Sequence, residues 1–365
     1  MSTYRIEFTT PLFSRGAFED QPEIRPASIR GQLHWWFRAL GGSYDDEKAI
    51  FGGVHGGAAA SKVVVRVAQN GSQAKCDEFR TLPHKQGGQA SPKKGFAPGT
   101  TCDLSVLTRH GGLDGKLKAE FDRTLEAWLL LGTLGLRGTR GAGSFCWESV
   151  RDAALHYPTS FVQYEDRCNR LLNGSALRFA LLKKAYTSTE DARRVVSDTL
   201  GGRDDRQGQG DLKVLNHPLG PVFDGRKTSP LRFRITVVGR EYRIAAVWDG
   251  REKVTGNTPD HLSGLVKLLA QRKPELGKQL AESGLRGFDL SSNLGAMLYR
   301  PLNDFAGQSG PFREFYTLSG GTGALRMAFR LRFPRLALAA SKNVFWARAT
   351  HAVKSASTWC RLKCT

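Results

Sequence analysis

The sequence predicts an α+β fold made of two units with the element order β-α-β-β-α-β, the second of them divergent. A length of 365 residues allows two domains, each with its own core. Within the first 150 residues, four short strand-like segments alternate with two segments whose apolar residues recur at helical spacing. A hairpin pattern and a helical pattern then recur beyond residue 230. These three observations carry the prediction.

The first half contains four predicted strands. Residues 4–9 alternate apolar and polar side chains, which is the period of a strand with one buried face. Residues 62–68 (KVVVRVA) and 103–108 (DLSVLT) are short and β-branched, and residues 144–150 (SFCWESV) close the unit.

Two amphipathic helices separate these strands. Ser28 can cap the first helix, Gly41 and Gly42 end it, and the second helix covers residues 115–131. The apolar positions at helical spacing are Ile29, Leu33, Trp36, Phe37 and Leu40 in the first helix and Leu117, Phe121, Leu125, Trp128 and Leu129 in the second. The resulting order is that of the ferredoxin-like, or RRM-like, plan: a four-stranded antiparallel sheet with both helices on one face. RNA-binding modules often use this plan, but so do many unrelated proteins.

The second half has fewer signals. Residues 159–186 look helical with a break near Asn173 and Gly174, and residues 201–211 are polar and glycine-rich, as expected of a mobile stretch. Residues 231–238 and 241–248 predict a hairpin around Gly239 and Arg240, and residues 261–270 predict a helix. The expected domains are therefore 1–152, a divergent ferredoxin-like unit at 153–315, and a tail at 316–365.

The tail carries only basic charges, because no acidic residue follows Glu314. It is either a helix facing RNA or a partner, or a poorly packed terminus. The whole chain has 54 Lys and Arg against 34 Asp and Glu, a net charge of +20. Such a surplus is typical of a protein that binds a polyanion, although a basic but inert surface is the alternative.

The sequence gives little support for a membrane protein, an exported protein or a metal-binding protein. No apolar run approaches the ~20 residues that span a bilayer, and residues 1–13 lack a signal pattern, so we expect a cytoplasmic protein. The six cysteines contain no C-x-x-C pair, which fits free thiols in a reducing compartment. Cys360 and Cys364 are close in sequence but have no neighbouring His, so we expect no zinc site and no cofactor.

The predicted first helix carries a candidate site for an RNA backbone. Arg30, His34 and Arg38 are four residues apart and would form a basic stripe along one face. The helix N-terminus beside Ser28 can accept a phosphate through its free N–H groups. Trp35 can stack on a base or pack inside, whereas Trp36 is expected to pack inside. The alternative is a solvated charged face with a histidine in the core.

A glycine-rich segment at residues 132–144 is the second candidate. Gly141 and Gly143 permit positive φ and close backbone approach, which would expose amide groups to an anion, with Arg137 and Arg140 supplying charge. ATP or NAD binding is disfavoured because the segment leaves a helix and enters a strand, and because it lacks G-K-[ST].

These segments resemble the RAMP superfamily of CRISPR proteins, in the variant found as subunit one of the type III-B (Cmr) effector. The matching residues are Thr10-Pro11-Leu12-Phe13, Arg25, Ser28-Ile29-Arg30-Gly31, Trp35-Trp36-Phe37-Arg38, Ile50-Phe51-Gly52, the glycine-rich segment, and Gly225-Arg226-Lys227-Thr228-Ser229-Pro230-Leu231. They span residues 1 to about 250.

The resemblance implies two ferredoxin-like domains and a place near the 3′ end of the guide RNA (crRNA). The implied partners are crRNA, target RNA and other Cmr-type subunits, with no cofactor. The implied backbone contacts are Arg30, His34, Trp35, Arg38, Arg137, Arg140, Arg226 and Lys227.

Two other functions compete with RNA binding. An endoribonuclease could use acidic residues before the first helix (Glu19, Asp20, Glu23), with His34 as a general base, because RAMP relatives cleave RNA with a loop Asp or a His. Against it, no partner that would orient His34 is apparent in the sequence. The third class is a scaffold that touches only neighbouring proteins.

Overall fold

The computed structural model describes residues 2–18, 21–54, 56–69, 75–109, 111–151, 155–201, 229–256, 259–272 and 274–283. Five sequence predictions fall outside these residues: the polar stretch from residue 202, the roles of Glu19 and Asp20, the contacts of Arg226 and Lys227, the Cys360 and Cys364 pair, and the basic tail. Among the helices described, none is long and apolar enough to cross a membrane.

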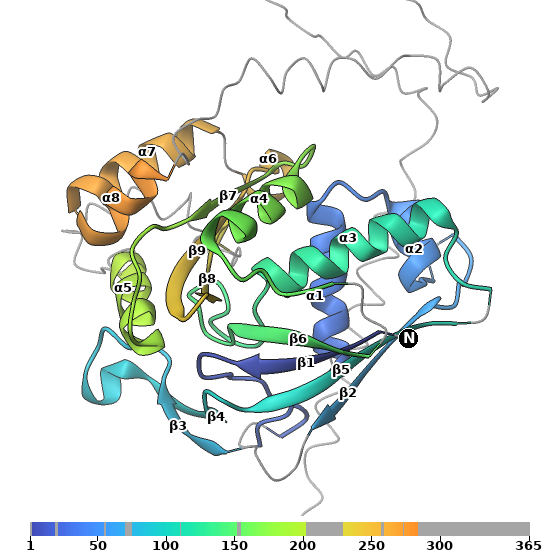
Figure 1. The fold of residues 1–365 in the computed structure, drawn as a ribbon, viewed down its shortest axis with the longest axis horizontal. Helices are drawn as coiled ribbons and strands as arrows, with labels where there is room; N and C mark the ends of the chain where they lie inside the picture. The colour runs from blue at the N-terminus through green and yellow to red at the C-terminus, as the bar shows by residue number, and fades with distance from the viewer. Residues whose placement is uncertain are drawn as a thin grey trace, which may run out of the picture. The chain divides into compact units, whose positions relative to one another are not determined.

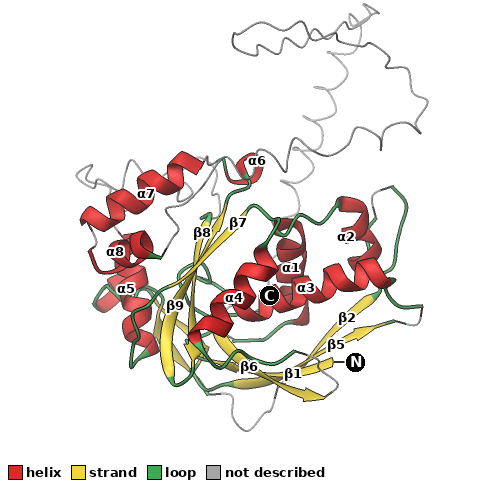
Figure 2. Cartoon of the chain, turned by 45° about the horizontal axis from the view of Figure 1, so that its top comes forward, coloured by secondary structure: helices red, strands yellow, loops and turns green. Residues whose placement is uncertain are grey.

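The first half forms a four-stranded antiparallel sheet of β1 (Ser2–Phe8), β2 (Val63–Gln69), β5 (Thr101–Thr108) and β6 (Phe145–Arg151). Its strand order is β2-β5-β1-β6, the interleaved order of the split βαβ plan. Helices α1 (Pro26–Ala39) and α3 (Gly115–Leu131) cover one face of the sheet (Figures 1 and 2). Tyr4, Ile6 and Phe8 point into the core between them. The expected α+β fold with antiparallel sheets is confirmed.

Four elements of the first half were not predicted: α2 (Tyr44–Phe51), β3 (Cys76–Arg80), the 3-10 turn η1 (Gly87–Ala90) and β4 (Pro92–Phe96). The start of α2 had a signal, since Ser43 accepts a hydrogen bond from the Asp46 amide at 3.1 Å and acids follow in the first turn. The β3–β4 hairpin had none, because most of its side chains are exposed and show no periodicity.

Helix α1 starts three residues earlier than predicted. Arg25 is the N-cap and Pro26 is the first helical residue, so Ser28 does not cap the helix. The reason is that proline has a fixed φ suited to the first helical position and needs no amide partner there. The predicted end is confirmed: Gly41 has φ +98°, and the amide of Gly42 donates to the Phe37 carbonyl at 3.0 Å.

The second half contains a three-stranded antiparallel sheet in the order β7-β9-β8. Its elements are α4 (Phe161–Leu172), β7 (Leu177–Leu181), α5 (Thr189–Gly201), β8 (Leu231–Val238), β9 (Glu241–Asp249), α6 (Glu252–Thr255), α7 (Pro259–Arg272) and α8 (Pro274–Glu282). The predicted hairpin is confirmed as β8–β9, and the predicted helix as part of α7. The helical prediction for 159–186 is right up to the break and wrong beyond it.

Residues 177–181 form a strand because their partner dictates it. They pair with β9 from Leu177 opposite Asp249 to Leu181 opposite Ala245. A run of five residues cannot be assigned to helix or strand by periodicity alone, and tertiary pairing decides. The order β7-α5-β8-β9-α7 repeats the order of the first half as far as its second helix. The domain boundaries at 152/153 and 315/316 stay predictions.

The two sheets share apolar packing through α4. One hydrophobic cluster runs from Trp36 and Trp128 in the first half to Tyr164 on α4 and Val247 on β9. A second cluster lies between the second sheet and helices α5, α7 and α8. The junction of the two halves is therefore well packed, and Trp35 and the glycine-rich segment lie at it.

Candidate nucleic-acid interface

The basic stripe on α1 exists, but the protein already uses most of its polar atoms. Arg30 donates to the carbonyl of Phe51, and its Nε lies 3.5 Å from Nε2 of His34. His34 Nδ1 lies 2.5 Å from Oε1 of Glu47 on α2, and Arg38 Nε lies 3.6 Å from the same oxygen. Only Arg38 keeps a widely exposed side chain, at 56%.

Glu47 is the residue that the sequence analysis missed here. It is 8% exposed and faces the stripe from the unpredicted helix α2. Its carboxylate offsets part of the stripe's positive charge and gives His34 the orienting partner that the sequence had not revealed. The His34 ring also packs on Phe51, with centroids 4.3 Å apart. His34 is thus a fixed part of the α1–α2 contact.

Trp35 packs at the junction of the two halves. It lies partly buried against the hydrophobic core, and the guanidinium of Arg232 on β8 sits 3.6 Å from its ring centroid. Arg251, just after β9, lies 5.3 Å from the same ring. Trp36 is buried, as expected. The sequence left open whether Trp35 stacks on a base or packs inside. In the structure the side chain is partly buried against the core, and two arginine guanidinium groups lie close to its ring.

The glycine-rich segment has the backbone conformation that its sequence predicts. Gly141 has φ +76° and Gly143 has φ +60°. A Cβ on Gly143 would stand 1.9 Å from the Leu134 carbonyl oxygen, so no other residue fits without a backbone shift.

The amide groups at these two positions are nevertheless not presented to an anion. The Gly143 amide donates to the Pro11 carbonyl at 2.9 Å, and the Gly141 amide donates to the Gly138 carbonyl at 3.1 Å. Both residues are buried. The expectation of exposed amides at Gly141 and Gly143 is therefore wrong, because both amides donate hydrogen bonds within the protein, one inside the loop and one to the segment after β1.

The same segment joins the two halves. The Phe233 amide on β8 donates to the Thr139 carbonyl at 3.1 Å, and the Ile235 amide donates to Ser144 Oγ at 3.0 Å. Arg140, opposite Phe233, is only 6% exposed. The accessible part of the segment is its tip, where Leu136 is 47% exposed and Arg137 has φ +62°. Positive φ in a bulky residue is uncommon and sets the direction in which the side chain leaves the loop.

Arg234 reinforces this joint from β8. It is buried, and its guanidinium donates to the Gly132 carbonyl at 2.8 Å and to the Phe145 carbonyl. It also lies 4.5 Å from the centroid of the Phe145 ring. The sequence contained no signal for this role, since Arg234 alternates with apolar residues on a strand in the manner of a solvent-facing residue.

The uncovered face of the first sheet does not resemble the RNA platform of RRM domains, which stack bases on aromatic side chains. On β1 this face bears Arg5 and Glu7, and Arg5 pairs with Asp103 at 3.0 Å and with Glu148 at 3.6 Å. Its positions on the four strands carry no aromatic residue. An RNA strand would therefore gain neither stacking nor a positive field there.

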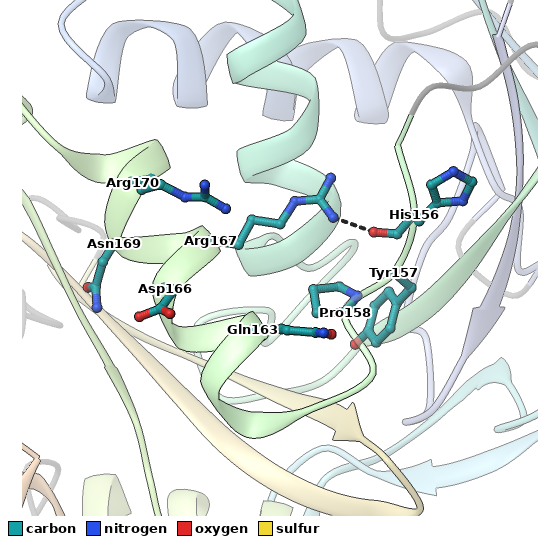
Figure 3. Close-up of a pocket in the computed structure, with 8 residues that line it drawn as sticks. All are labelled: His156, Tyr157, Pro158, Gln163, Asp166, Arg167, Asn169 and Arg170. Carbon is teal, nitrogen blue, oxygen red and sulfur yellow. Dashed lines mark hydrogen bonds between the residues drawn. The ribbon is translucent and has the colours of Figure 1, made fainter.

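A polar cavity of about 620 Å³ lies between α4 and the segment 156–158 (Figure 3). Arg167 crosses it, donates to the His156 carbonyl and pairs with Glu126 on α3. Most of the remaining lining is exposed and polar, including Gln163, Asp166 and Arg170. Arg167 is thus already engaged in holding the segment before α4 in place.

Two further observations bear on catalysis. Within the described ranges, no group of three or more His, Cys, Asp or Glu side chains is placed to hold a metal ion. Of the three acids before α1, only Glu23 is described, and its amide donates to the Ser14 carbonyl at 2.9 Å.

Known proteins match the chain in sequence and in fold. Residues 5–146 match the RAMP superfamily. The CRISPR system Cmr subunit Cmr1-2 of Pyrococcus furiosus is 40% identical over 72 residues, 17% of this chain and 37% of that protein. Subunit Cmr1-1 of the same organism is 30% identical over 164 residues, 39% of this chain and 44% of that protein. The matches thus span less than half the length of either relative.

A chain in the cryo-EM structure of the type III-B Cmr-beta complex bound to cognate target RNA has a similar fold. The TM-score is 0.50 with 9% identity, over 68% of this chain and 94% of that chain. Residues 5–146 thus match the RAMP superfamily, and the chain resembles subunit Cmr1 of the type III-B CRISPR systems.

Proposed function

We propose that this chain is a non-catalytic RNA-binding subunit of a type III-B CRISPR effector, and that it contacts the 3′ region of the crRNA and the backbone of the target RNA in antiviral defence. The observation that carries the proposal is the sequence similarity to two Cmr1 subunits, which includes 40% identity over 72 residues. The fold agrees with it, through a chain from a Cmr complex bound to target RNA.

Charge supports RNA as the partner. The net charge of +20 is large for 365 residues, and Lys or Arg side chains that replace counterions on phosphates would turn it into affinity. On α1, the exposed Arg38 is the member of the stripe best placed to reach a phosphate, because Arg30 and His34 are held by Phe51 and Glu47.

Binding to single-stranded RNA tests this proposal. Each phosphate contact adds about −0.7 to the slope of log affinity against log salt, and we expect several contacts. Arg38→Ala should weaken binding equally for all sequences, because backbone contacts carry no base information. Arg194→Ala on α5 is the matched control, since both side chains are 56% exposed. A slope near zero for the full chain would refute RNA binding.

An endoribonuclease is the second candidate, and the His34–Glu47 pair favours it. A carboxylate on Nδ1 orients an imidazole for base catalysis at Nε2. Here, however, Nε2 accepts from Arg30 instead of facing a substrate. End-labelled RNA should therefore stay intact with the full chain, with or without Mg²⁺. Discrete products that disappear in His34→Ala or Glu47→Gln would establish a nuclease instead.

A further inference from the structure

Arg232, the second residue of β8, has no hydrogen-bond acceptor for its Nε among the described residues. Its guanidinium lies over the Trp35 ring, 3.6 Å from the ring centroid. Its Nε is buried and has no partner among the described residues, whereas the residue as a whole is partly exposed. Buried donors in folded proteins are nearly always paired, and a buried donor without an acceptor costs folding free energy. A group that is absent from the free chain would remove this cost.

Among the described residues, Asp249 is the carboxylate that acts on Arg232, and it is already occupied. Both oxygens of Asp249, at the end of β9, accept hydrogen bonds from Arg251, at 2.9 and 2.7 Å. Two guanidinium groups therefore share a single negative charge, and one positive charge is left over beside Trp35. Burial lowers the pKa of Arg232 to about 10; Asp249 opposes this and Arg251 adds to it. The group still carries its charge at neutral pH.

Space for a ligand exists next to the indole. Gly31 lies four residues before Trp35, so the two positions are neighbours on one face of α1. Gly31 is exposed, and a Cβ placed on it would meet nothing within 4 Å. Glycine in the interior of a helix is unfavourable relative to alanine, and no contact within the described residues calls for it here. Because Gly31 has no side chain, a ligand could approach the backbone of α1 closely at this position.

We propose that Trp35, Arg232 and Arg251 form a phosphate site, in which Arg232 donates to a phosphodiester of bound RNA while the strand passes α1 at Gly31. The proposal rests on the RNA-binding function above and adds the point at which one strand would touch both halves of the chain. Guanidinium groups suit this task because their planar donors match the oxygens of a phosphate and because they stack on aromatic rings. Phosphate contacts of this kind position a strand without reading its sequence.

Arg232→Met is the sharpest test, because methionine keeps an unbranched stem over the indole and removes only the donors and the charge. Single-stranded RNA should bind about 10-fold to 100-fold more weakly, the usual range for one hydrogen bond to a charged group. The salt slope should become less steep by about 0.7. The thermal midpoint should change little, because the side chain makes no hydrogen bond to the described residues that the substitution would remove. Arg194→Met on α5 is the control for net charge.

A second variant tests the path of the strand independently of Arg232. Gly31→Gln adds a neutral side chain beside Trp35 and improves helix propensity, so the protein should remain folded and bind RNA more weakly. Unchanged binding by this variant would contradict a strand passing at Gly31.

The outcomes separate the site from the function. If wild type binds RNA and Arg232→Met matches Arg194→Met, the phosphate site is wrong and the RNA-binding function stands. If wild type binds no RNA, inorganic phosphate decides: a rise in thermal midpoint for wild type but not for Arg232→Met supports the site, and equal or absent shifts overturn it. A much lower midpoint for Arg232→Met would also overturn it, because the guanidinium would then already have a partner in the free chain.

Discussion

Replacing Arg234 with methionine should destabilise the joint between the two halves. The side chain is buried on β8 and donates to the carbonyls of Gly132 and Phe145, which bracket the glycine-rich segment. Methionine retains the apolar stem but cannot donate. Both carbonyls would then be buried without these donors, at the place where the segment holds β8.

The magnitude follows from those two bonds. A hydrogen bond from a charged donor contributes about 1.5–3 kcal/mol, and an unsatisfied buried polar group costs a similar amount. Against this, the Nε of Arg234 is buried without a partner and its removal gives back about 1 kcal/mol. We therefore expect a net loss of about 3 kcal/mol, most of it from the contact between the glycine-rich segment and β8.

Urea unfolding and hydrogen exchange measure this loss. The urea concentration at the unfolding midpoint should fall. In hydrogen exchange, the backbone amides of residues 132–145 and 231–238 should be the first to lose their protection. Arg232→Met, two residues earlier on the same strand, is the matched control and should show no loss, because Arg232 lacks the hydrogen bonds that Arg234 makes. A loss below about 1 kcal/mol for Arg234→Met, or equal effects of the two variants, would show that the two hydrogen bonds of Arg234 do not hold the segment to β8.

Three further outcomes follow from local geometry. Gly143→Ala should lower stability by more than 2 kcal/mol, from a positive φ worth about 1–2 kcal/mol and a clash with a carbonyl, whereas Thr139→Ala should change it little; unfolding midpoints compare them. Burial raises the pKa of the Cys168 thiol, so almost no thiolate should be present at pH 8 and Cys168 should react with a disulfide reagent only on unfolding. The exposed Cys76 should react in the native state. Peptide mapping identifies the labelled cysteines. Glu47→Gln should weaken the α1–α2 contact by about 1–3 kcal/mol, since the charge that receives His34 and Arg38 is lost, and a thermal midpoint equal to that of wild type would contradict this.

The sequence predicted most elements whose signal is local. Alternation identified β1 and β8, helical spacing identified α1 and α3, and Gly239 with φ +64° marks the turn that its sequence suggested. The sequence-based prediction failed for segments whose secondary structure depends on pairing with residues far along the chain. Residues 177–181 become a strand only because β9 pairs with them.

The candidate site shows the same division. Positive φ at Gly141 and Gly143 follows from residue type, but the use of their amides depends on Pro11 and on the loop itself. Glu47 meets His34 only through the packing of α2, and Arg232 meets Trp35 only through the packing of the two halves. Contacts between residues far apart in the chain produce no periodic pattern in a single sequence. Charge and spacing therefore predicted the basic stripe on α1, but they did not show that Arg30 and His34 already have intramolecular hydrogen-bond partners.

Sequencing the RNA that copurifies with this chain and its genomic neighbours tests the central claim most directly. We expect the chain to elute in one complex with other Cmr-type subunits and with short RNAs that share a repeat-derived end. Ultraviolet crosslinks from this chain should fall near the 3′ region of those RNAs. A stable complex that forms without RNA, is insensitive to salt and yields no crosslinks to this chain would contradict it and favour a scaffold that touches only proteins.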